Sequence, residues 1–243
     1  MAEDGFFTIL DTVDSTNNYA IGRVQDGLAK HGMAWFSKEQ TAGKGQRGKS
    51  WATGKGQNIA MSVVLEPEKL QIANQFQLSA VVAISCFEFF SGYTAGETKI
   101  KWPNDLFWRD RKAGGILIEN KFQGKAWKWA VVGIGININQ AKFDDFAAEP
   151  VSLKQITGKT NDPVELAKEL HTLLMKNLPE MKNPEEVLKQ YNEHLYKINK
   201  KVTLKKAAVK FETVIKGVSL QGRLITVDAV EREFDFGEVE WIL

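Results

Sequence analysis

The segment from Asn74 to Phe90, NQFQLSAVVAISCFEFF, restricts the fold more than any other part of the chain. Its apolar residues lie on nearly every side of a helix rather than along one stripe. A helix of this kind is stable only where other elements cover it, so the segment predicts a buried helix in a globular domain. Cys86 lies in this segment, and because it is the only cysteine, it has no disulfide partner within the chain. We interpret Cys86 as a core residue.

Six β-rich runs surround this helix in the sequence. Strands are predicted at residues 6–13, 33–40, 58–67, 99–108, 112–122 and 128–138. The first run leads into a short helix, for which Asp14 or Ser15 is the candidate cap. A glycine-rich loop at 41–57 joins the second run to the third. The last three runs predict an adjoining set of strands.

A helix-start signature, in which a cap residue precedes a proline, occurs at Asp162 and again at Asn183. A glutamate stands at the third helical position in both cases. The signature predicts two helices, at residues 163–178 and 184–195.

Beyond Lys197 the pattern changes to short strands separated by turn glycines. Such a segment predicts a small β-barrel. We therefore expect two domains, at residues 1–196 and 197–243. The lysines at the start of the second domain are interpreted as a solvated face.

Charge and hydropathy exclude several classes of protein. The 32 basic and 30 acidic residues leave a net charge of +2, which argues against a general nucleic-acid or anionic-membrane binder. The N-terminus carries acids and no long apolar stretch, so it does not predict a signal peptide. No run approaches the roughly 18 apolar residues that a membrane-spanning helix needs. We expect a soluble, cytoplasmic protein that binds neither DNA nor membranes.

The loop at 43–50, GKGQRGKS, matches two phosphate-binding patterns, GxGxxG and the P-loop GxxxxGK[ST]. Both patterns hold phosphate at the N-terminus of a helix that follows the loop. Here Gly54 and Gly56 follow instead, and then a strand-like run, so we reject both patterns. The glycines still allow the backbone to approach a ligand closely, and the two lysines and the arginine supply positive charge. The loop therefore suits an anionic ligand.

Four further segments bring polar groups or glycines to strand ends and turns. DSTNNYA at 14–20 supplies donors and acceptors at short range. KWPNDLFW at 101–108 sets a lysine, a proline and an Asn-Asp pair among large apolar groups, and DRKAGGILIE at 110–119 follows it. VVGIGININ at 131–139 carries two glycines inside a strand, which indicates that something approaches its backbone closely.

Together, DSTNN, EQTAGKGQRGKSW, KWPNDL, RKAGGILIE and GIGININ occur in the order and approximate spacing of the biotin protein ligase family. The chain resembles this family over nearly its whole length. The resemblance implies an α+β fold, with a mixed-sheet catalytic domain similar to class II aminoacyl-tRNA synthetases and a small C-terminal SH3-like β-barrel. DSTNN begins at residue 14, so we expect the ligase-only form rather than the form with an N-terminal DNA-binding domain.

The resemblance also implies a two-step reaction. Biotin and ATP form biotinyl-5'-adenylate, and biotin then passes to a lysine of a biotin carboxyl carrier protein. ATP and Mg²⁺ are the implied cofactors, and the enzyme is expected to be a monomer or a homodimer. The chemistry requires no side-chain nucleophile, which agrees with the position of His31, His171 and His194 outside the motifs.

The roles that the family implies fall on matching positions of this chain. Lys112 and Arg47 are the expected catalytic residues, and Lys112 is the expected cation beside the biotin carboxylate and the α-phosphate. The residues expected to bind biotin are Ser15, Thr16, Asn17, Gln40, Gly43, Lys44, Gly45, Gln46, Lys112, Gly115 and Gly133. The residues expected to bind ATP or the adenylate are Lys49, Trp51, Asn104, Asp105 and Asn137. Mg²⁺ is expected near Asp105 and Asn137.

Two positions depart from the family pattern, because many members carry arginine where this chain has Lys44 and Gln46. Lysine keeps the charge but loses the bidentate hydrogen bond, and glutamine loses the charge. Retention of the adenylate would then rely more on Arg47 or Lys49. The sequence leaves two alternatives open: a lipoate or octanoate ligase or transferase of related fold, and a non-catalytic biotin- or nucleic-acid-binding module.

Overall fold

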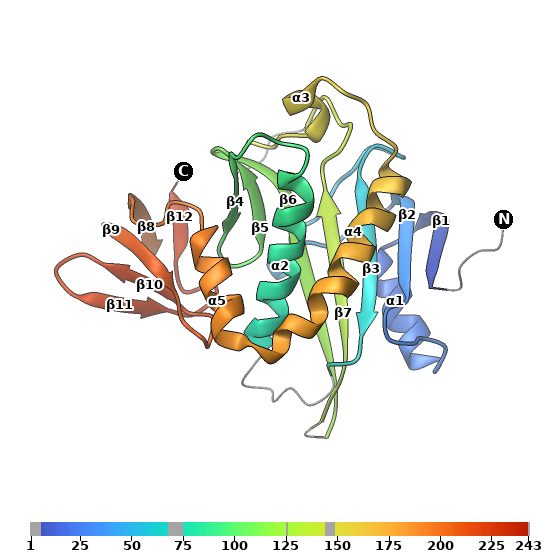
Figure 1. The fold of residues 1–243 in the computed structure, drawn as a ribbon, viewed down its shortest axis with the longest axis horizontal. Helices are drawn as coiled ribbons and strands as arrows, with labels where there is room; N and C mark the ends of the chain where they lie inside the picture. Colours follow the sequence, from blue (N-terminus) through green and yellow to red (C-terminus); the bar gives the residue numbers. More distant parts are fainter. Residues whose placement is uncertain (1–5, 68–74, 125, 144–148, 243) are drawn as a thin grey trace.

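The computed structural model in Figure 1 describes residues 6–67, 75–124, 126–143 and 149–242. Its largest layer is a seven-stranded sheet in the order β1-β2-β3-β7-β6-β5-β4. The strands are β1 (Phe7–Val13), β2 (Ala34–Gln40), β3 (Ile59–Leu65), β4 (Thr98–Lys101), β5 (Asp105–Trp108), β6 (Arg111–Gln123) and β7 (Ala126–Ile136). β1 and β2 are parallel and the other neighbours are antiparallel, so the predicted mixed sheet is confirmed.

The run at 99–108 forms a hairpin rather than one strand. β4 ends at Lys101, the chain turns at 102–104, and β5 begins at Asp105. Pro103 has no N–H to donate to a strand ladder, which favours a turn at this point. As a result, Lys101 and Asp105 are register partners across the hairpin.

Helices cover both faces of this sheet. They are α1 (Thr16–Gln25), α2 (Gln75–Ser91), α3 (Leu153–Thr157), α4 (Pro163–Asn177) and α5 (Pro184–Glu193), with 3-10 turns η1 (Gln46–Gly48) and η3 (Leu178–Lys182). Because side chains alternate along a strand, neighbouring residues enter different cores. Phe36 and Val63 pack in the larger core with α2 and α4, whereas Trp35 and Val64 pack with Ala20 of α1. Thus α1 lies on the face opposite to α2 and α4.

The predicted buried helix is confirmed as α2, although Asn74, its predicted first residue, lies outside the described residues. Strands β4 and β5 lie on one side of α2, and α4 and α5 pack against it as well. Cys86 is 1% exposed, and burial raises the pKa of its thiol to about 12. The interpretation of Cys86 as a core residue is therefore confirmed.

The two predicted helix starts differ in the structure. Asp162 accepts a hydrogen bond from the backbone N–H of Val164 at 2.8 Å, which confirms the first cap. Asn183 makes no capping bond, because η3 runs directly into α5 and leaves it at φ −115° and ψ 69°. The predicted helix start at Pro184 is confirmed with Asn183 in the N-cap position, but the side-chain cap is absent, and α5 ends at Glu193 rather than at about 195. Ser15 occupies the N-cap position of α1 but its side chain makes no capping bond.

We expect Asp162→Ala to lower the free energy of unfolding by about 1 kcal/mol, because it removes a side-chain cap. Asn183→Ala is the matched control, and should change it by less than about 0.5 kcal/mol because no capping bond is lost. Urea unfolding with an unchanged m-value measures both effects. Equal losses in the two variants would contradict this difference between the caps.

A second, five-stranded antiparallel sheet has the order β11-β10-β9-β8-β12. Its strands are β8 (Lys201–Lys206), β9 (Val209–Val218), β10 (Leu224–Val227), β11 (Glu231–Phe234) and β12 (Glu240–Ile242). Among the described residues β11 pairs only with β10, and β12 only with β8, so the predicted barrel is an open sheet. The sequence did not predict β11, because its first three residues are charged and exposed. The domain boundary after residue 196 stays a prediction.

Several side chains join this sheet to the rest of the molecule, among them Asn192 and Trp102. Asn192 forms two hydrogen bonds with the backbone of Val218, at 3.1 and 2.8 Å. Trp102 Nε1 donates to the carbonyl of Gly222 at 2.9 Å.

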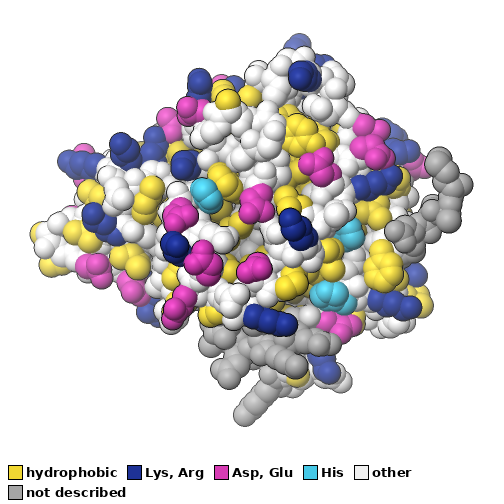
Figure 2. Space-filling model, in the orientation of Figure 1, with side chains coloured by type: hydrophobic (Ala, Val, Ile, Leu, Met, Phe, Trp, Pro, Cys, Tyr) yellow, Lys and Arg dark blue, Asp and Glu magenta, His cyan; other side chains and the backbone are white. Residues whose placement is uncertain are grey.

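Within the described residues, no helix is both long and apolar enough to cross a bilayer. On the face that carries α2, α4 and α5, basic and acidic side chains are interspersed (Figure 2).

Candidate active site

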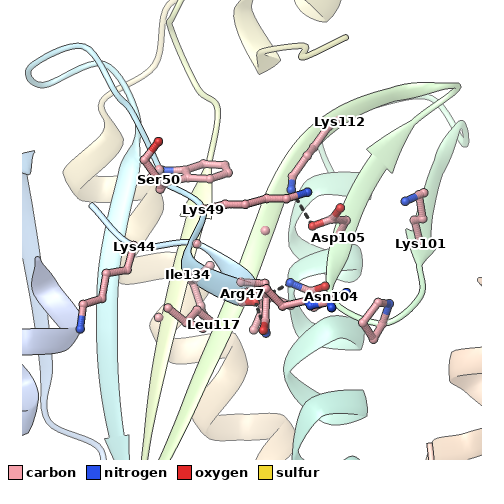
Figure 3. A pocket seen from close by; sticks show the side chains of 18 of the residues that line it. Lys44, Arg47, Lys49, Ser50, Lys101, Asn104, Asp105, Lys112, Leu117 and Ile134 are labelled. Carbon is pink, nitrogen blue, oxygen red and sulfur yellow. Dashed lines mark hydrogen bonds and ion pairs between the residues drawn. The ribbon is translucent and has the colours of Figure 1, made fainter. Parts of the chain in front are cut away.

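A cavity of about 980 Å³ brings together segments that are far apart in the sequence. The start of α1, the glycine-rich loop, the β4–β5 hairpin, β6 and β7 all line it (Figure 3). The predicted site residues that share this cavity are Ser15, Thr16, Asn17, Gln40, Lys44, Gly45, Gln46, Arg47, Lys49, Trp51, Asn104, Asp105, Lys112, Gly115, Gly133 and Asn137. Gly43 is the one predicted site residue outside the lining. None of the three histidines lines the cavity.

The glycine-rich loop folds back on itself instead of opening a helix. Lys44 and Ser50 form an antiparallel bridge, and Trp51 N donates to the carbonyl of Gly43 at 2.8 Å. A Cβ on Gly43 would lie 2.3 Å from the Trp51 carbonyl oxygen, so this close approach requires glycine. Only the 3-10 turn η1 follows before β3. The rejection of both phosphate-loop patterns is therefore confirmed.

Hydrogen bonds fix the polar side chains at the start of α1. Thr16 donates to Gln40 Oε1 from its backbone N at 2.8 Å and from Oγ1 at 3.1 Å. Asn17 Nδ2 donates to Glu119 Oε2 at 2.8 Å, and Asn17 Oδ1 accepts from Ser62 Oγ at 2.6 Å. Both polar ends of the Asn17 side chain are thus occupied within the protein. Ser62 and Glu119 were not predicted, because only the folded sheet brings them to α1.

Two polar groups at this end of the cavity have no hydrogen-bond partner within the described part of the chain. The Ser15 hydroxyl belongs to a residue that is 1% exposed, and the Gln40 side chain uses its oxygen for Thr16, which leaves its Nε2 donor free. Both residues line the cavity. A ligand with polar ring atoms would supply the missing partners.

Gly133 has a steric role at the same end of the cavity. A Cβ on Gly133 would lie 2.4 Å from Asn17 Oδ1, so a side chain here would displace Asn17. The sequence predicted a close approach to this glycine, and the approaching group within the protein is Asn17. A Cβ on Gly115 would meet Asp105 and Lys112 only at the ordinary distance of 3.5 Å.

Lysines gather around Asp105 at the other end of the cavity. Lys112 Nζ pairs with Asp105 Oδ1 at 2.7 Å, and its side chain is 30% exposed. Lys49 extends from the loop toward this pair, whereas the Lys44 amine points away from it (Figure 3). Lys101 lies on the other side of Asp105 in the same view and also lines the cavity. Three cations therefore surround one carboxylate, which suits a polyanionic ligand.

Asn137 and Asn104 hold the backbone that carries this cluster. Asn137 Nδ2 donates to the carbonyls of Lys112 and Val151, at 3.3 and 3.2 Å. Asn104 Nδ2 donates to the Ile116 carbonyl at 2.8 Å, and Gln46 Nε2 reaches the same oxygen at 3.4 Å. The amide nitrogens of all three side chains thus bond to backbone carbonyls.

Lys101 was not among the predicted site residues, although it opens the KWPND motif. Burial lowers the pKa of its ammonium group to about 8. Attraction by Asp105 opposes this shift, while repulsion by Lys112 and Lys49 adds to it. The lysine at the start of this motif was the signal that could have identified it.

Trp51 lines the cavity and packs against β7. A Cβ on Gly135 would lie 2.4 Å from its indole ring, so glycine makes room for the ring. Lys112 Nζ is 5.9 Å from the ring centroid. The indole therefore provides an aromatic surface beside the lysine cluster.

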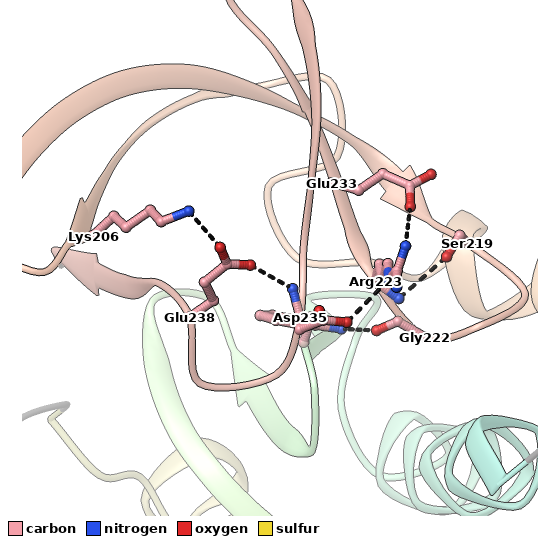
Figure 4. A network of polar contacts seen from close by, with 8 residues as sticks. Lys206, Ser219, Gly222, Arg223, Glu233, Asp235 and Glu238 are labelled. Carbon is pink, nitrogen blue, oxygen red and sulfur yellow. Dashed lines mark hydrogen bonds and ion pairs between the residues drawn. The ribbon is translucent and has the colours of Figure 1, made fainter. Parts of the chain in front are cut away.

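The segment between β11 and β12 forms a wall of the cavity that the sequence did not predict. Its lining residues are Phe236, Gly237 and Val239, and Glu240 and Trp241 of β12 line the cavity next to them. Arg47 donates from the loop to the Gly237 carbonyl at 3.3 Å. A polar network holds this segment, with Arg223 bonded to Asp235 at 3.0 Å and Asp235 N donating to Glu238 at 3.0 Å (Figure 4). The sequence did not indicate this wall because the contact between Arg47 and Gly237 spans 190 positions.

The described residues contain no group of three or more His, Cys, Asp or Glu side chains arranged to hold a metal ion. Asp105 is the acid within the lysine cluster, and one of its oxygens pairs with Lys112. Magnesium in nucleotide sites is commonly held by one or two carboxylates, waters and the phosphates themselves. If the phosphates mainly held such an ion, Asp105 would be the carboxylate available to it in this cluster.

The fold and the cavity define a class of protein: a mixed-sheet α+β domain with one pocket for a polar group and a polyanion. The sequence model of the Biotin/lipoate A/B protein ligase family matches residues 9–137. The Biotin--[acetyl-CoA-carboxylase] ligase of Paracoccus denitrificans is 36% identical over 165 residues, which cover 65% of this chain and 66% of that protein. The bifunctional ligase/repressor BirA of Escherichia coli is 37% identical over 139 residues, covering 57% of this chain and 42% of that protein.

Solved structures show the same fold. A biotin protein ligase from Aquifex aeolicus in complex with biotin and ATP superposes with a TM-score of 0.80 at 26% identity, covering 96% of this chain and 97% of that chain. The match to the Escherichia coli relative spans less than half of its length. The chain belongs to the biotin/lipoate A/B protein ligase family.

Proposed function

We propose that this protein is an ATP-dependent, AMP-forming biotin protein ligase that transfers biotin to a lysine of a biotin carboxyl carrier protein. One observation carries the proposal. A single cavity has free polar groups at Ser15 and Gln40 at one end and the lysine cluster around Asp105 at the other. Curated relatives that are 36–37% identical carry the ligase name, which supports the same activity here.

In the first step, an oxygen of the biotin carboxylate attacks the α-phosphorus of ATP, and pyrophosphate leaves. Both reactants are anionic, so fixed cations must offset their repulsion and the charge that builds up at phosphorus. Lys112, with Lys49 and Lys101 near it, supplies this charge. Arg47 and Lys49 belong to the loop, and they would cover the nucleotide.

In the second step, the acceptor lysine amine attacks the acyl carbon of the adenylate, its N–H proton is released, and AMP leaves.

Ser15 and Gln40 would hold the polar ring of biotin, since burying its ureido atoms without partners costs about 1–3 kcal/mol each. Thr16 would hold Gln40 in position through its two hydrogen bonds to Oε1. Trp51 would stack on adenine, and Asn104 and Asn137 hold the backbone under the lysine cluster. Bound magnesium would neutralise phosphate charge next to Asp105.

Incorporation of labelled biotin into a carrier domain, with and without ATP, tests the proposal. We expect label in the acceptor only when ATP is present, together with one pyrophosphate per adenylate formed. Competition with lipoate addresses the rival substrate class, and biotin should win because lipoate lacks a ureido group for Ser15 and Gln40. Biotin binding with no pyrophosphate release would favour a non-catalytic module and would contradict the proposal.

We also expect biotin to order the loop at 43–49. The glycines and exposed cations of this loop favour movement in the free protein, and a bound adenylate gives the cations a partner. Hydrogen exchange at these amides should slow in the presence of biotin and ATP, while the amides of α4, on the opposite side of the sheet from α1, should be unchanged. Equal exchange with and without ligands would count against loop closure.

The partner and the location follow from this function as further proposals. The carrier protein is the proposed partner, with no DNA and no membrane involved, and the enzyme would act as a monomer or a homodimer. A ligase that consumes ATP needs a compartment that supplies it, so we propose the cytoplasm.

A further inference from the structure

Lys101 is a cavity-lining cation whose contacts are aromatic rather than ionic. Its Nζ lies 5.2 Å from the centroid of the Phe107 ring and 5.3 Å from that of Trp241. Its register partner across the hairpin, Asp105, is paired with Lys112 instead. Within the described residues Lys101 forms no ion pair, so its charge stays available to a ligand.

The Trp241 ring reaches Lys101 from the second sheet through a packed set of aromatic rings. Tyr196 connects them, with its ring centroid 5.1 Å from that of Phe107 and 5.7 Å from that of Trp241. The Tyr196 hydroxyl donates to Asp110 at 2.7 Å, which fixes this ring to the β5–β6 turn. Trp241 is therefore held against the first sheet although β12 is a short edge strand.

The charged groups that face Lys101 come from three elements. Asp105 on β5 attracts its ammonium group, while Lys112 on β6 and Lys49 of the loop repel it. An aromatic face attracts a cation without neutralising it. Contact with the rings therefore keeps the ammonium group in the cavity, whereas an ion pair would consume its charge. A cation that is already in place loses less conformational entropy when an anion binds.

We propose that Trp241 is a positioning residue that holds the Lys101 ammonium group where it binds the phosphates of the nucleotide. The inference rests on the proposed function, because the anion that it assigns is ATP. This role of Trp241 makes the second sheet part of the nucleotide site through the contact between its ring and Lys101.

A double-mutant cycle on ATP affinity tests the contact. Trp241→Leu should raise the Kd for ATP about three- to fivefold at pH 7, the range of a cation–π contact, while Trp241→Phe keeps an aromatic face and should stay close to wild type. Lys101→Met should raise the Kd about tenfold or more. In the K101M background, Trp241→Leu should have no further effect, because the cation that the ring holds is absent. Lys99→Met, on the same strand but outside the cavity lining, is the matched lysine control and should leave the Kd unchanged.

The pH dependence of the same Kd separates positioning from a general effect on structure. Burial lowers the pKa of Lys101 to about 8, so wild-type affinity should weaken above that pH, as the group loses its charge. Trp241→Leu should move this weakening to higher pH because the amine becomes hydrated, and Lys101→Met should abolish it.

Two results would overturn the inference. One is an equal effect of Trp241→Leu in both backgrounds, and the other is an unchanged pH midpoint in that variant. Either result in an enzyme that still biotinylates its acceptor would refute only the role of Trp241. A wild-type protein that binds no ATP at any pH would refute the proposed function together with this inference.

Discussion

Replacing Lys112 with alanine is expected to lower the rate of biotinyl-adenylate formation at least about 100-fold while the fold stays intact. Lys112 is the cavity cation in direct contact with Asp105, at 2.7 Å. Its removal takes away a positive charge and also leaves a carboxylate unpaired beside the reacting anions. Because the Lys112 side chain is 30% exposed, its loss should affect folding far less than catalysis.

Pyrophosphate release in single turnovers measures the rate, and thermal unfolding reports the fold. Lys121→Ala is the matched control, because it removes the same charge from the same strand but outside the cavity lining. Adenylation by the Lys112 variant at a near-normal rate would refute the assignment. A loss of equal size in both variants would point to general electrostatics instead of a specific contact.

Gly133→Ala is expected to weaken biotin binding at least about tenfold, which corresponds to about 1.4 kcal/mol. The added Cβ would lie 2.4 Å from Asn17 Oδ1, and Asn17 is 3% exposed and bonded at both ends of its amide. Asn17 must therefore leave its partners, and each buried polar group left unsatisfied costs about 1–3 kcal/mol. Because Ser62 Oγ bonds to both Asn17 and Thr16, and Thr16 bonds to Gln40, we expect the displacement of Asn17 to shift Thr16 and Gln40 as well.

Titration calorimetry with biotin measures this effect. Gly22→Ala is the control, because an added Cβ at this position in α1 meets nothing within 4 Å. We expect normal biotin affinity there, and a slight gain in stability because alanine favours a helix. Biotin affinity in the Gly133 variant equal to that of wild type would show that the position of Asn17 does not determine the pocket.

Local patterns account for much of what the sequence predicted. The apolar segment became α2, the cap at Asp162 formed, and the glycines after the loop excluded a P-loop helix. These features depend on residues a few positions apart, which determine helix starts and turns directly. Asn183 makes no capping bond because the 3-10 turn η3 ends directly before this residue and determines its backbone conformation. The residue type alone does not reveal such a turn.

The sequence by itself indicated which polar and glycine-bearing segments would meet, because their order resembles that of the biotin protein ligase family. Only the tertiary structure decided which hydrogen-bond partner each of those residues has. Asn17 reaches Glu119 across 102 positions, and Arg47 reaches Gly237 across 190. Such contacts depend on strand order and on the docking of the second sheet, for which neither partner carries a local signal. For the same reason Lys101 and Trp241, on different sheets, could be recognised as neighbours only in the folded chain.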